Sequence, residues 1–564
     1  MSTPLKITQQ LDHVVPDVKD WPIYKVSQDK EAFLKEIIQR TQEEILAKFE
    51  SPTALHDELK SVLFQEKNRL TKTPWKADSP EEKTFWSEIK RKILLSSKEE
   101  DEDIRYKKDK KILKKILDHY AHEIVANFEP AKYRKIRKIL PWVFARLMNA
   151  SPGESWKFLS KNRKTIYDKL KITGPIEHIR NLAKQGTVVV VPTHFSNLDS
   201  PTIGFVIDVI GLPAMTYGAG LNLFTLKLLS NWMGNLGAYK LDRRKKNTPY
   251  LELLKNYSTV ALQRGVHSLF FPGGTRSRSG KIEKRLKLGL LSTAVEAQRQ
   301  NLTNFQEETA KKIFIVPAVI NYHFVMEAES LIKQHLAIEG KEQFIAERED
   351  FSTSYKLIKL VYKFLTATAG MTISFATPLD VLGNEVNEEG KSINKIGQEV
   401  NIKDYFLRDG VMSEDKQRDF VYTKMLGEEI VKKFHSHNTV LTSHLLAFTA
   451  FQLIKRDYPN LDLFEFLRIP VDEIEIDYDT LRMEVEKVKN RVIELFAEEK
   501  LQVSHQIKGE TDALIKHGLK NLGVYHAQMP LIKKDNNTVL TQDLKLLYFY
   551  HNRLEGYGLD KLFQ

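Results

Sequence analysis

Between about residues 174 and 380, short apolar runs alternate with longer helical patterns, and this alternation restricts the possible folds more than any other feature. The run Val188–Val191 is made entirely of β-branched residues and is followed by Pro192, as expected for a buried strand. Strands that are separated by helices indicate an α/β layer fold. The other strand candidates are Ser268–Phe271, Ile313–Ile320 and Met371–Phe375, and the helical stretches between them include Tyr250–Gln263 and Leu286–Ala297.

The chain on either side of this portion reads as helical. Glu31–Phe49 has apolar residues at the spacing of one helix face, and Pro80–Glu82 is typical of a helix start. From about residue 385 the pattern becomes mainly helical again. We therefore expect three parts: a helical N-terminal region at residues 1–155, an α/β domain at 156–385 and a helical C-terminal region at 386–564.

The composition narrows the classes of function. Cysteine is absent, which excludes disulfides and cysteine-rich metal centres. The net charge of +12 favours anionic partners such as lipid headgroups, nucleic acid or phosphorylated substrates, with a merely solvated basic surface as the plain alternative. The lysines are spread along helices without a recognised nucleic-acid-binding motif, so we expect no nucleic-acid partner. The composition sets no oligomeric state.

The apolar stretches do not predict a membrane-spanning helix. Such a helix needs ~20 mostly apolar residues. The uncharged stretch Val209–Leu226 contains several glycines and a proline, and Thr439–Ile454 is shorter. Either stretch could be a buried helix or lie in a membrane interface. The first thirty residues lack an unbroken apolar segment, so we expect a cytoplasmic protein. The basic surplus and the two apolar stretches favour peripheral attachment to the inner face of the cell membrane.

A histidine and an aspartate flank the turn that follows the Val188–Val191 strand. His194 comes directly after the strand, and Asp199 directly precedes Ser200-Pro201, which offers an N-cap and a proline for a helix start. A turn of this length can bring the two side chains together. The aspartate would then fix the tautomer of the histidine and raise the basicity of its other ring nitrogen. A histidine that merely caps the helix is the alternative.

Two arginine-bearing segments and an apolar strand follow in the α/β portion. They are Gly237–Arg244, Phe270–Gly280 and Ile315–Ile320. Glycines in the second of these let the backbone approach a ligand, and its arginines suit bidentate binding of phosphate oxygens. Read alone, each arginine segment could be a solvated basic loop and the strand could be simple core. Together with His194 and Asp199, they predict a site for a phosphorylated alcohol beside a fatty chain.

In this order and spacing the segments resemble the sequence blocks of the glycerolipid acyltransferase superfamily. His194–Asp199 matches its His-x4-Asp block, and Gly237–Arg243 resembles the second block. Phe271–Arg278 is similar to the third block, usually Phe-Pro-Glu-Gly-Thr-Arg-Ser, and Val316-Pro317 to the fourth. The resemblance implies an α/β fold whose central mixed sheet is flanked by helices.

Two C-terminal segments resemble the glycerol-3-phosphate acyltransferases within this superfamily. They are Asn438–Thr442, which leads into an apolar helix, and Leu547–Leu554, which is similar to a closing Tyr-Tyr-x-Asn-Asn signature. One position departs from the family pattern, because Gly273 stands where the third block usually has glutamate. If that glutamate orients the substrate or an arginine, another residue has to do so in this chain.

The resemblance implies a direct transfer of an acyl group from acyl-CoA or acyl carrier protein to the sn-1 hydroxyl of glycerol 3-phosphate. His194 would be the general base and Asp199 would hold its tautomer. The resemblance implies no metal and no redox cofactor. Lysophosphatidate or dihydroxyacetone phosphate as acceptor, and a non-catalytic lipid-binding relative, are the alternatives. The residues expected to bind the substrate are Arg243, Gly274, Thr275, Arg276 and Arg278.

Overall fold

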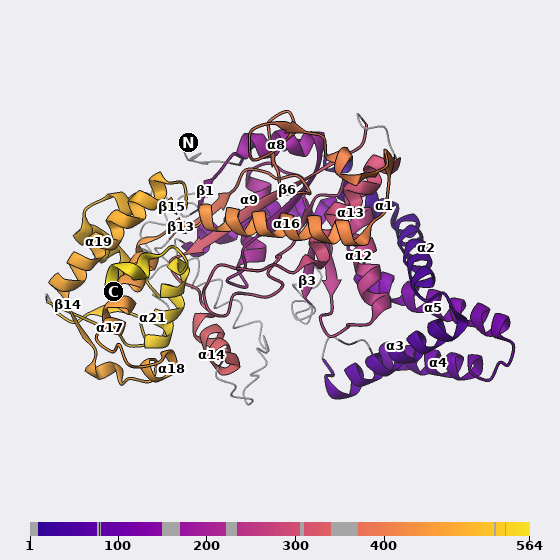
Figure 1. Cartoon of the computed structure of the whole chain (residues 1–564), viewed down its shortest axis with the longest axis horizontal. Coiled ribbons are helices and arrows are strands. Elements are labelled where there is room, and N and C mark those ends of the chain that lie inside the picture. The colour runs from indigo at the N-terminus through magenta and orange to yellow at the C-terminus, as the bar shows by residue number, and fades with distance from the viewer. Residues whose placement is uncertain are drawn as a thin grey trace.

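The structure is a computed structural model that describes residues 10–75, 78, 80–148, 170–220, 234–304, 309–339, 370–523, 526–535 and 537–564. A group of N-terminal helices, a central sheet covered by helices and a C-terminal group of helices lie along the long axis of the molecule (Figure 1). The fold is α/β with a mixed central sheet, which confirms the fold class expected from the sequence.

The central sheet has seven strands in the order β1-β7-β6-β2-β5-β3-β4. β6, β2, β5, β3 and β4 run parallel to one another, whereas β7 is antiparallel to β6 and β1 is parallel to β7. The strands are β1 (Leu170–Thr173), β2 (Gly186–Pro192), β3 (Thr216–Gly220), β4 (Ala238–Leu241), β5 (Ser268–Leu269), β6 (Lys312–Tyr322) and β7 (Met371–Phe375).

Helices cover the sheet because its central strands are buried on both faces. All four valines of Val188–Val191 are completely buried, as is usual for a central parallel strand. α8 packs on β2, and both α13 and α16 pack on β6. The helices of this part are α8 (Ile176–Gln185), α9 (Asp199–Val209), α12 (Thr248–Gln263), α13 (Leu288–Asn304), α14 (Ala328–Glu339) and α16 (Lys416–Ser436).

The N-terminal helices form a second hydrophobic core. Its apolar side chains come from the inner faces of these helices and from α12, through which α2 and α5 contact the α/β part. The alternation of apolar and charged residues at helix spacing explains why one face of each helix is buried. The helices are α1 (Pro22–Gln28), α2 (Lys30–Lys48), α3 (Pro52–Lys72), α4 (Glu81–Ser96), α5 (Glu102–Ile124) and α6 (Pro130–Met148).

The C-terminal helices surround α17, which is buried on almost every side. α19, α20 and α21 all pack against it, and their core is continuous with that of the central sheet. A helix that is apolar all round belongs in a protein interior. Of the two interpretations of Thr439–Ile454, the structure therefore supports the buried helix. The helices are α17 (Thr442–Arg456), α18 (Leu463–Phe466), α19 (Tyr478–Ala497), α20 (Thr511–Asn521) and α21 (Leu544–His551).

Short strands join the C-terminal helices. β8 (Glu385–Val386), β9 (Ser392–Ile393) and β10 (Glu399–Val400) form one small sheet. The others are β11 (Leu407–Arg408), β12 (Val411–Met412), β13 (Thr439–Val440), β14 (Glu475–Asp477), β15 (Gln502–Val503), β16 (Ile532–Lys533) and β17 (Thr538–Leu540). Among the described residues, no helix is both long and apolar enough to cross a lipid bilayer.

One helix start differs from the expectation. α9 begins at Asp199, with Leu198 as N-cap, so the prediction that Ser200 caps this helix is wrong. The carboxylate of Asp199 holds the backbone of Phe195 and Ser196, which tightens the turn and starts the helix earlier. The expected boundary at residues 155 and 156 lies outside the described residues, as does the part of Val209–Leu226 after Gly220. The boundary at 385 stays a prediction.

Candidate active site

The structure brings His194 and Asp199 together at the end of β2. Asp199 is completely buried, and its Oδ2 lies 2.8 Å from Nδ1 of His194. The same oxygen accepts the backbone N–H groups of Phe195 at 2.6 Å and Ser196 at 2.8 Å. A carboxylate only accepts hydrogen bonds, so the proton of the neutral ring sits on Nδ1. Nε2 is then the nitrogen that can take a proton from a substrate.

Two aromatic rings from other elements fix this pair. The hydroxyl of Tyr322, at the end of β6, donates to Oδ1 of Asp199 at 2.8 Å. Burial, followed by the charge of Asp199, raises the pKa of Tyr322 well above its usual value, so the hydroxyl remains a donor. The ring of Phe271 stacks on that of His194 with 4.1 Å between the centroids. The imidazole is therefore held both through its nitrogen and across its face.

Glu327 connects the His194 turn to one of the predicted arginines. Its carboxylate accepts the Ser196 hydroxyl at 3.0 Å and the Asn197 backbone N–H at 2.9 Å. Arg276 lies 3.4 Å from the same carboxylate. Burial raises the pKa of Glu327, and the positive charge of Arg276 opposes this rise. The segment Phe270–Gly280 is thus anchored beside the His194 turn.

A second arginine lies near the first. Burial removes water from the guanidinium of Arg243 and lowers its pKa, and the positive charge of Arg276 lowers it further. Its neighbour in the sequence, Arg244, has a different environment, because it forms ion pairs with Asp242 at 2.7 Å and with Asp78 at 2.5 Å. Arg244 therefore ties the end of β4 to the N-terminal helices, whereas Arg243 and Arg276 form a positive pair that suits an anion.

The remaining predicted residues lie on the turn of the third segment. Gly274 has a φ of +77°, a left-handed conformation that favours glycine. Thr275 and Arg278 are exposed. The charge of Arg278 contributes to lowering the pKa of His335, after burial and other charges, so this arginine lies near α14.

The C-terminal signature reaches the back of the site. The guanidinium of Arg553 lies 3.7 Å from the ring centroid of Phe195 and donates to the Ile320 carbonyl at 2.7 Å. Asn552 donates to the carbonyl of Ser279 at 2.8 Å. Phe195, Tyr322 and Arg553 also line one small cavity. Two segments that the sequence pattern suggested separately are therefore in direct contact.

Three residues of the site were not predicted from the sequence as functional: Tyr322, Glu327 and Arg553. Only Arg553 had a signal, because it belongs to the Leu547–Leu554 signature. Tyr322 closes an apolar strand, and Glu327 precedes a short helix, which are ordinary positions for those residue types.

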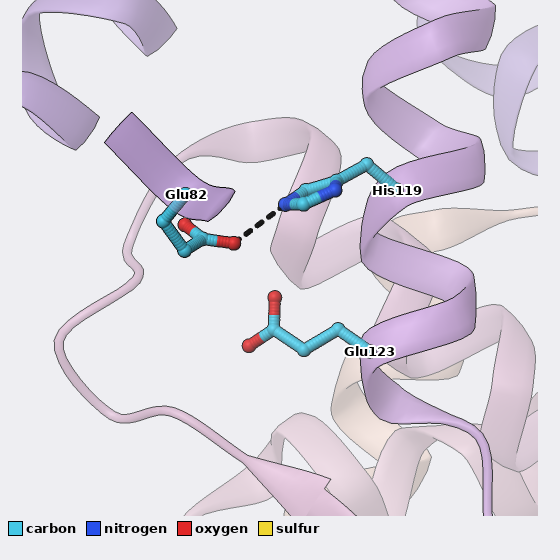
Figure 2. Close-up of side chains that lie close together, drawn as sticks. All are labelled: Glu82, His119 and Glu123. Carbon is cyan, nitrogen blue, oxygen red and sulfur yellow. Dashed lines mark hydrogen bonds and ion pairs between the residues drawn. The ribbon is translucent and has the colours of Figure 1, made fainter. Parts of the chain in front are cut away.

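A separate group of residues has the spacing of a metal site. Glu82 on α4 and both His119 and Glu123 on α5 place their ligand atoms within 4.8 Å of one another, and Figure 2 shows Glu82 pointing at His119. Protein cations already neutralise these carboxylates: Arg69 donates to Glu82 at 2.7 Å, and Lys245 pairs with Glu123.

The pKa of Glu82 reflects this balance of charges. Burial alone would raise it, but the hydrogen bond from His119 and the charges of Lys245 and Arg69 lower it to about 2. A divalent cation would have to displace both Arg69 and Lys245. We therefore assign Glu82, His119 and Glu123 to an ion-pair network that joins the N-terminal helices to β4.

Comparisons with known proteins agree with this geometry. The Acyltransferase family model matches residues 175–321. A glycerol-3-phosphate acyltransferase of Glaesserella parasuis is 27% identical over 261 residues, which is 45% of this chain and 27% of that protein. One from Actinobacillus pleuropneumoniae is 25% identical over 302 residues, covering 53% and 31%. One from Pseudomonas aeruginosa is 23% identical over 261 residues, covering 46% and 27%.

The matched part thus amounts to less than a third of each relative's length. The family-model match at residues 175–321 contains His194, Asp199, both segments with the predicted arginines and nearly all of the buried strand β6. The matched family model and the relatives' names agree with the resemblance found in the sequence blocks. Residues 175–321 therefore match an acyltransferase domain, and this chain is similar in part to glycerol-3-phosphate acyltransferases.

Proposed function

We propose that the protein transfers a fatty acyl group from a thioester to the sn-1 hydroxyl of glycerol 3-phosphate and so forms lysophosphatidate. The observation that carries this proposal is the His194–Asp199 hydrogen bond of 2.8 Å beside the positive pair of Arg243 and Arg276. The first can activate a hydroxyl, and the second can hold a phosphate on the same small acceptor.

In the proposed reaction His194 acts as general base through Nε2. It removes the proton of the hydroxyl while the hydroxyl oxygen attacks the thioester carbonyl. The new C–O bond forms, the C–S bond breaks, and the departing thiolate takes the proton from the imidazolium. Asp199 stabilises the imidazolium charge between the two steps. General-base assistance of this kind contributes about 10²- to 10⁴-fold.

The arginines position the acceptor. The guanidinium groups of Arg243 and Arg276 lie close enough to affect each other's charge, so a bound phosphate relieves their repulsion. Arg278 supplies a further positive charge, and Gly274 and Thr275 shape the turn that presents the arginines. A bound phosphate holds the hydroxyl of the same molecule near the base. The entropy cost of bringing the two groups together is then met by binding and not in the chemical step.

The donor is an acyl thioester of coenzyme A or of acyl carrier protein, and the proposed steps use neither a metal nor a redox cofactor. The net charge of +12 suits both donors, since each is acidic. A lipid product and a basic chain also support peripheral attachment to the inner face of the cell membrane, where anionic headgroups are found.

The test is an assay of purified protein with labelled glycerol 3-phosphate and long-chain acyl-CoA, run beside the His194→Ala variant. Acyl carrier protein thioester is supplied in parallel, and lysophosphatidate and dihydroxyacetone phosphate serve as other acceptors. Formation of lysophosphatidate that disappears in the variant supports both the reaction and the base.

Two results would overturn the proposal. Acylation of only another acceptor would move the enzyme to a different step of glycerolipid synthesis. Absence of any product with every donor and acceptor, from folded protein in the presence of membranes, would favour a non-catalytic lipid-binding relative.

A further inference from the structure

A carboxylate from outside the four sequence blocks lies against the turn of His194. Oε1 of Glu283 accepts the backbone N–H of His194 at 3.3 Å. On the other side of the same residue, the carbonyl of His194 accepts the backbone N–H of Ser277 at 2.7 Å. The backbone of His194 is thus held on one side by the arginine turn and on the other by the segment that follows this turn.

The segment that carries Glu283 folds back along that turn. Ile282 is buried, and the backbone N–H of Lys287 donates to the carbonyl of Pro272 at 2.7 Å. These contacts bring the Glu283 side chain over Gly273. A Cβ atom added to Gly273 would lie 2.9 Å from Oε1 of Glu283 and 3.2 Å from its Cγ. Glu283 therefore fills the space into which a side chain at position 273 would grow.

The carboxylate of Glu283 is buried, and one of its oxygens, Oε2, lacks a hydrogen-bond partner in the described part of the chain. Burial raises the pKa of Glu283 to about 7, with Arg553 opposing the rise and Asp199 adding to it. An unpartnered buried polar atom costs about 1–3 kcal/mol, so its presence beside His194 needs a reason.

We propose that Glu283 is a positioning residue for the catalytic base and that it supplies, from ten residues further along the chain, the carboxylate that Gly273 does not provide. Its Oε1 fixes the backbone of His194 against the arginine turn, and its Oε2 is buried. This inference rests on the proposed function, because it assigns Glu283 a part in placing His194 for proton transfer.

The experiment is a double-mutant cycle with Glu283→Ala, Gly273→Glu and the two combined. In Glu283→Ala, kcat should fall by about 10²-fold, the loss expected from a small displacement of a catalytic group. Gly273→Glu alone should also lose activity, because its side chain starts in space that Glu283 occupies. In the combined variant that space is vacant, and kcat should recover at least about 10-fold relative to Glu283→Ala.

A conservative variant separates positioning from mere packing. The amide oxygen of Glu283→Gln can still accept the His194 N–H, so kcat should stay within about 3-fold of the wild-type value, as for a neutral hydrogen bond of similar geometry. KM for both substrates should stay nearly constant in all variants, since Glu283 acts through His194 and not on the substrates. Wild-type kcat in Glu283→Ala, or a combined variant no better than Glu283→Ala, would overturn the inference.

The Tm values of the same four proteins provide a readout that needs no activity. If the Tm changes of the Glu283→Ala and Gly273→Glu variants are not additive in the combined variant, the two side chains compete for the same space. This result would support the inference even if no variant shows activity, and only the proposed function would then fail. An active wild type whose two substitutions are simply additive in both Tm and kcat would overturn the inference and leave the proposed function intact.

Discussion

Asp199 accepts hydrogen bonds at both oxygens, and this arrangement makes its charge state and geometry essential. Oδ2 serves His194 and two backbone N–H groups, and Oδ1 serves Tyr322. An amide cannot accept at both atoms, so Asp199→Asn would place N–H groups against donors and favour the wrong imidazole tautomer. We expect kcat to fall about 10²- to 10⁴-fold with KM nearly unchanged.

Steady-state kinetics check this prediction, with Tyr322→Phe as the matched control. That variant removes one of the four hydrogen bonds and leaves the tautomer in place, so its loss should be much smaller. A wild-type kcat in Asp199→Asn would contradict the assignment of His194 as the base.

Arg276 is also argued at the scale of one residue, since its guanidinium is one of those proposed to bind the phosphate, together with Arg243 and Arg278. A charge-assisted hydrogen bond contributes about 1.5–3 kcal/mol, so Arg276→Ala should raise KM for glycerol 3-phosphate about 10- to 150-fold. The preference for glycerol 3-phosphate over glycerol should fall with it. Arg264→Ala is the control, because Arg264 pairs with Asp29 and Glu36 and lies before the start of β5, whereas His194 follows the end of the parallel strand β2. An unchanged KM in Arg276→Ala would place the phosphate elsewhere.

The sequence predicted the residues of this site only where they are close together in the chain. His194 and Asp199 share one turn, so their spacing was informative, and the structure joins them at 2.8 Å. Tyr322 and Arg553 come from distant strands and helices and reach the pair only after the sheet and the C-terminal helices have formed. No local pattern marked Tyr322, and the Leu547–Leu554 signature that includes Arg553 did not indicate its contact with the site, because both contacts form only in the tertiary structure.

At the scale of elements, the central strands were predictable and the others were not. β2 and β6 contain continuous buried apolar runs and every residue of β7 is buried, so the positions of these strands agree with the sequence pattern. β3 contains two glycines in five residues, and β4 is a short edge strand that pairs only with β3 among the described strands. Short, glycine-containing or half-exposed strands lack the periodic signal from which strands are predicted.

Gly280 is the point at which the arginine turn meets α21. Its φ is +83°, and a Cβ atom would lie 2.2 Å from the carbonyl oxygen of Phe549. Gly280→Ala should therefore separate the two elements and lower the free energy of unfolding by about 1–3 kcal/mol or more, because both the conformation and the space are unsuitable. Activity should fall as well, since the neighbouring Ser279 and Asn552 form the contact behind the site.

Gly204→Ala is the matched control for this substitution. Gly204 lies inside α9, and an added Cβ would meet no atom within 4 Å. The alanine should stabilise the protein by up to about 1 kcal/mol through helix propensity. Urea unfolding of both variants measures the difference, and equal stability of the two would show that the contact between Gly280 and Phe549 is not needed.

Across the whole molecule, buried histidines should make the protein sensitive to acid. Burial lowers the pKa of His267 and His437 to about 4 and of His323 and His551 to about 3. The unfolded chain then binds protons first, near pH 6.5. The stabilisation is complete above that pH and is lost as the pH falls from about 6.5 through 4, at up to about 1.4 kcal/mol per pH unit for each histidine.

Denaturant unfolding between pH 7.5 and 4.5 measures this slope. Glu283 has the opposite effect on stability as the pH falls. Because its pKa is raised in the folded state, the folded protein binds this proton at a higher pH than the unfolded chain does. His551→Phe keeps a ring against Phe448 but cannot titrate, so its slope should be smaller by up to about 1.4 kcal/mol per pH unit. The same slope in this variant as in the wild type would mean that His551 is already accessible to protons in the folded state.

Attachment to a membrane is the last property that belongs to the whole molecule, because it depends on the summed charge and not on one side chain. The net charge of +12 should attract the protein to anionic vesicles, at about 1 kcal/mol for each lysine or arginine that comes near the surface. This attraction is screened over about 10 Å at 0.1 M salt and about 3 Å at 1 M. We therefore expect flotation with anionic vesicles at low salt, little with neutral vesicles, and release at 1 M salt. Flotation that persists at 1 M salt would instead indicate apolar insertion, and no flotation under any condition would contradict the proposed attachment to the membrane.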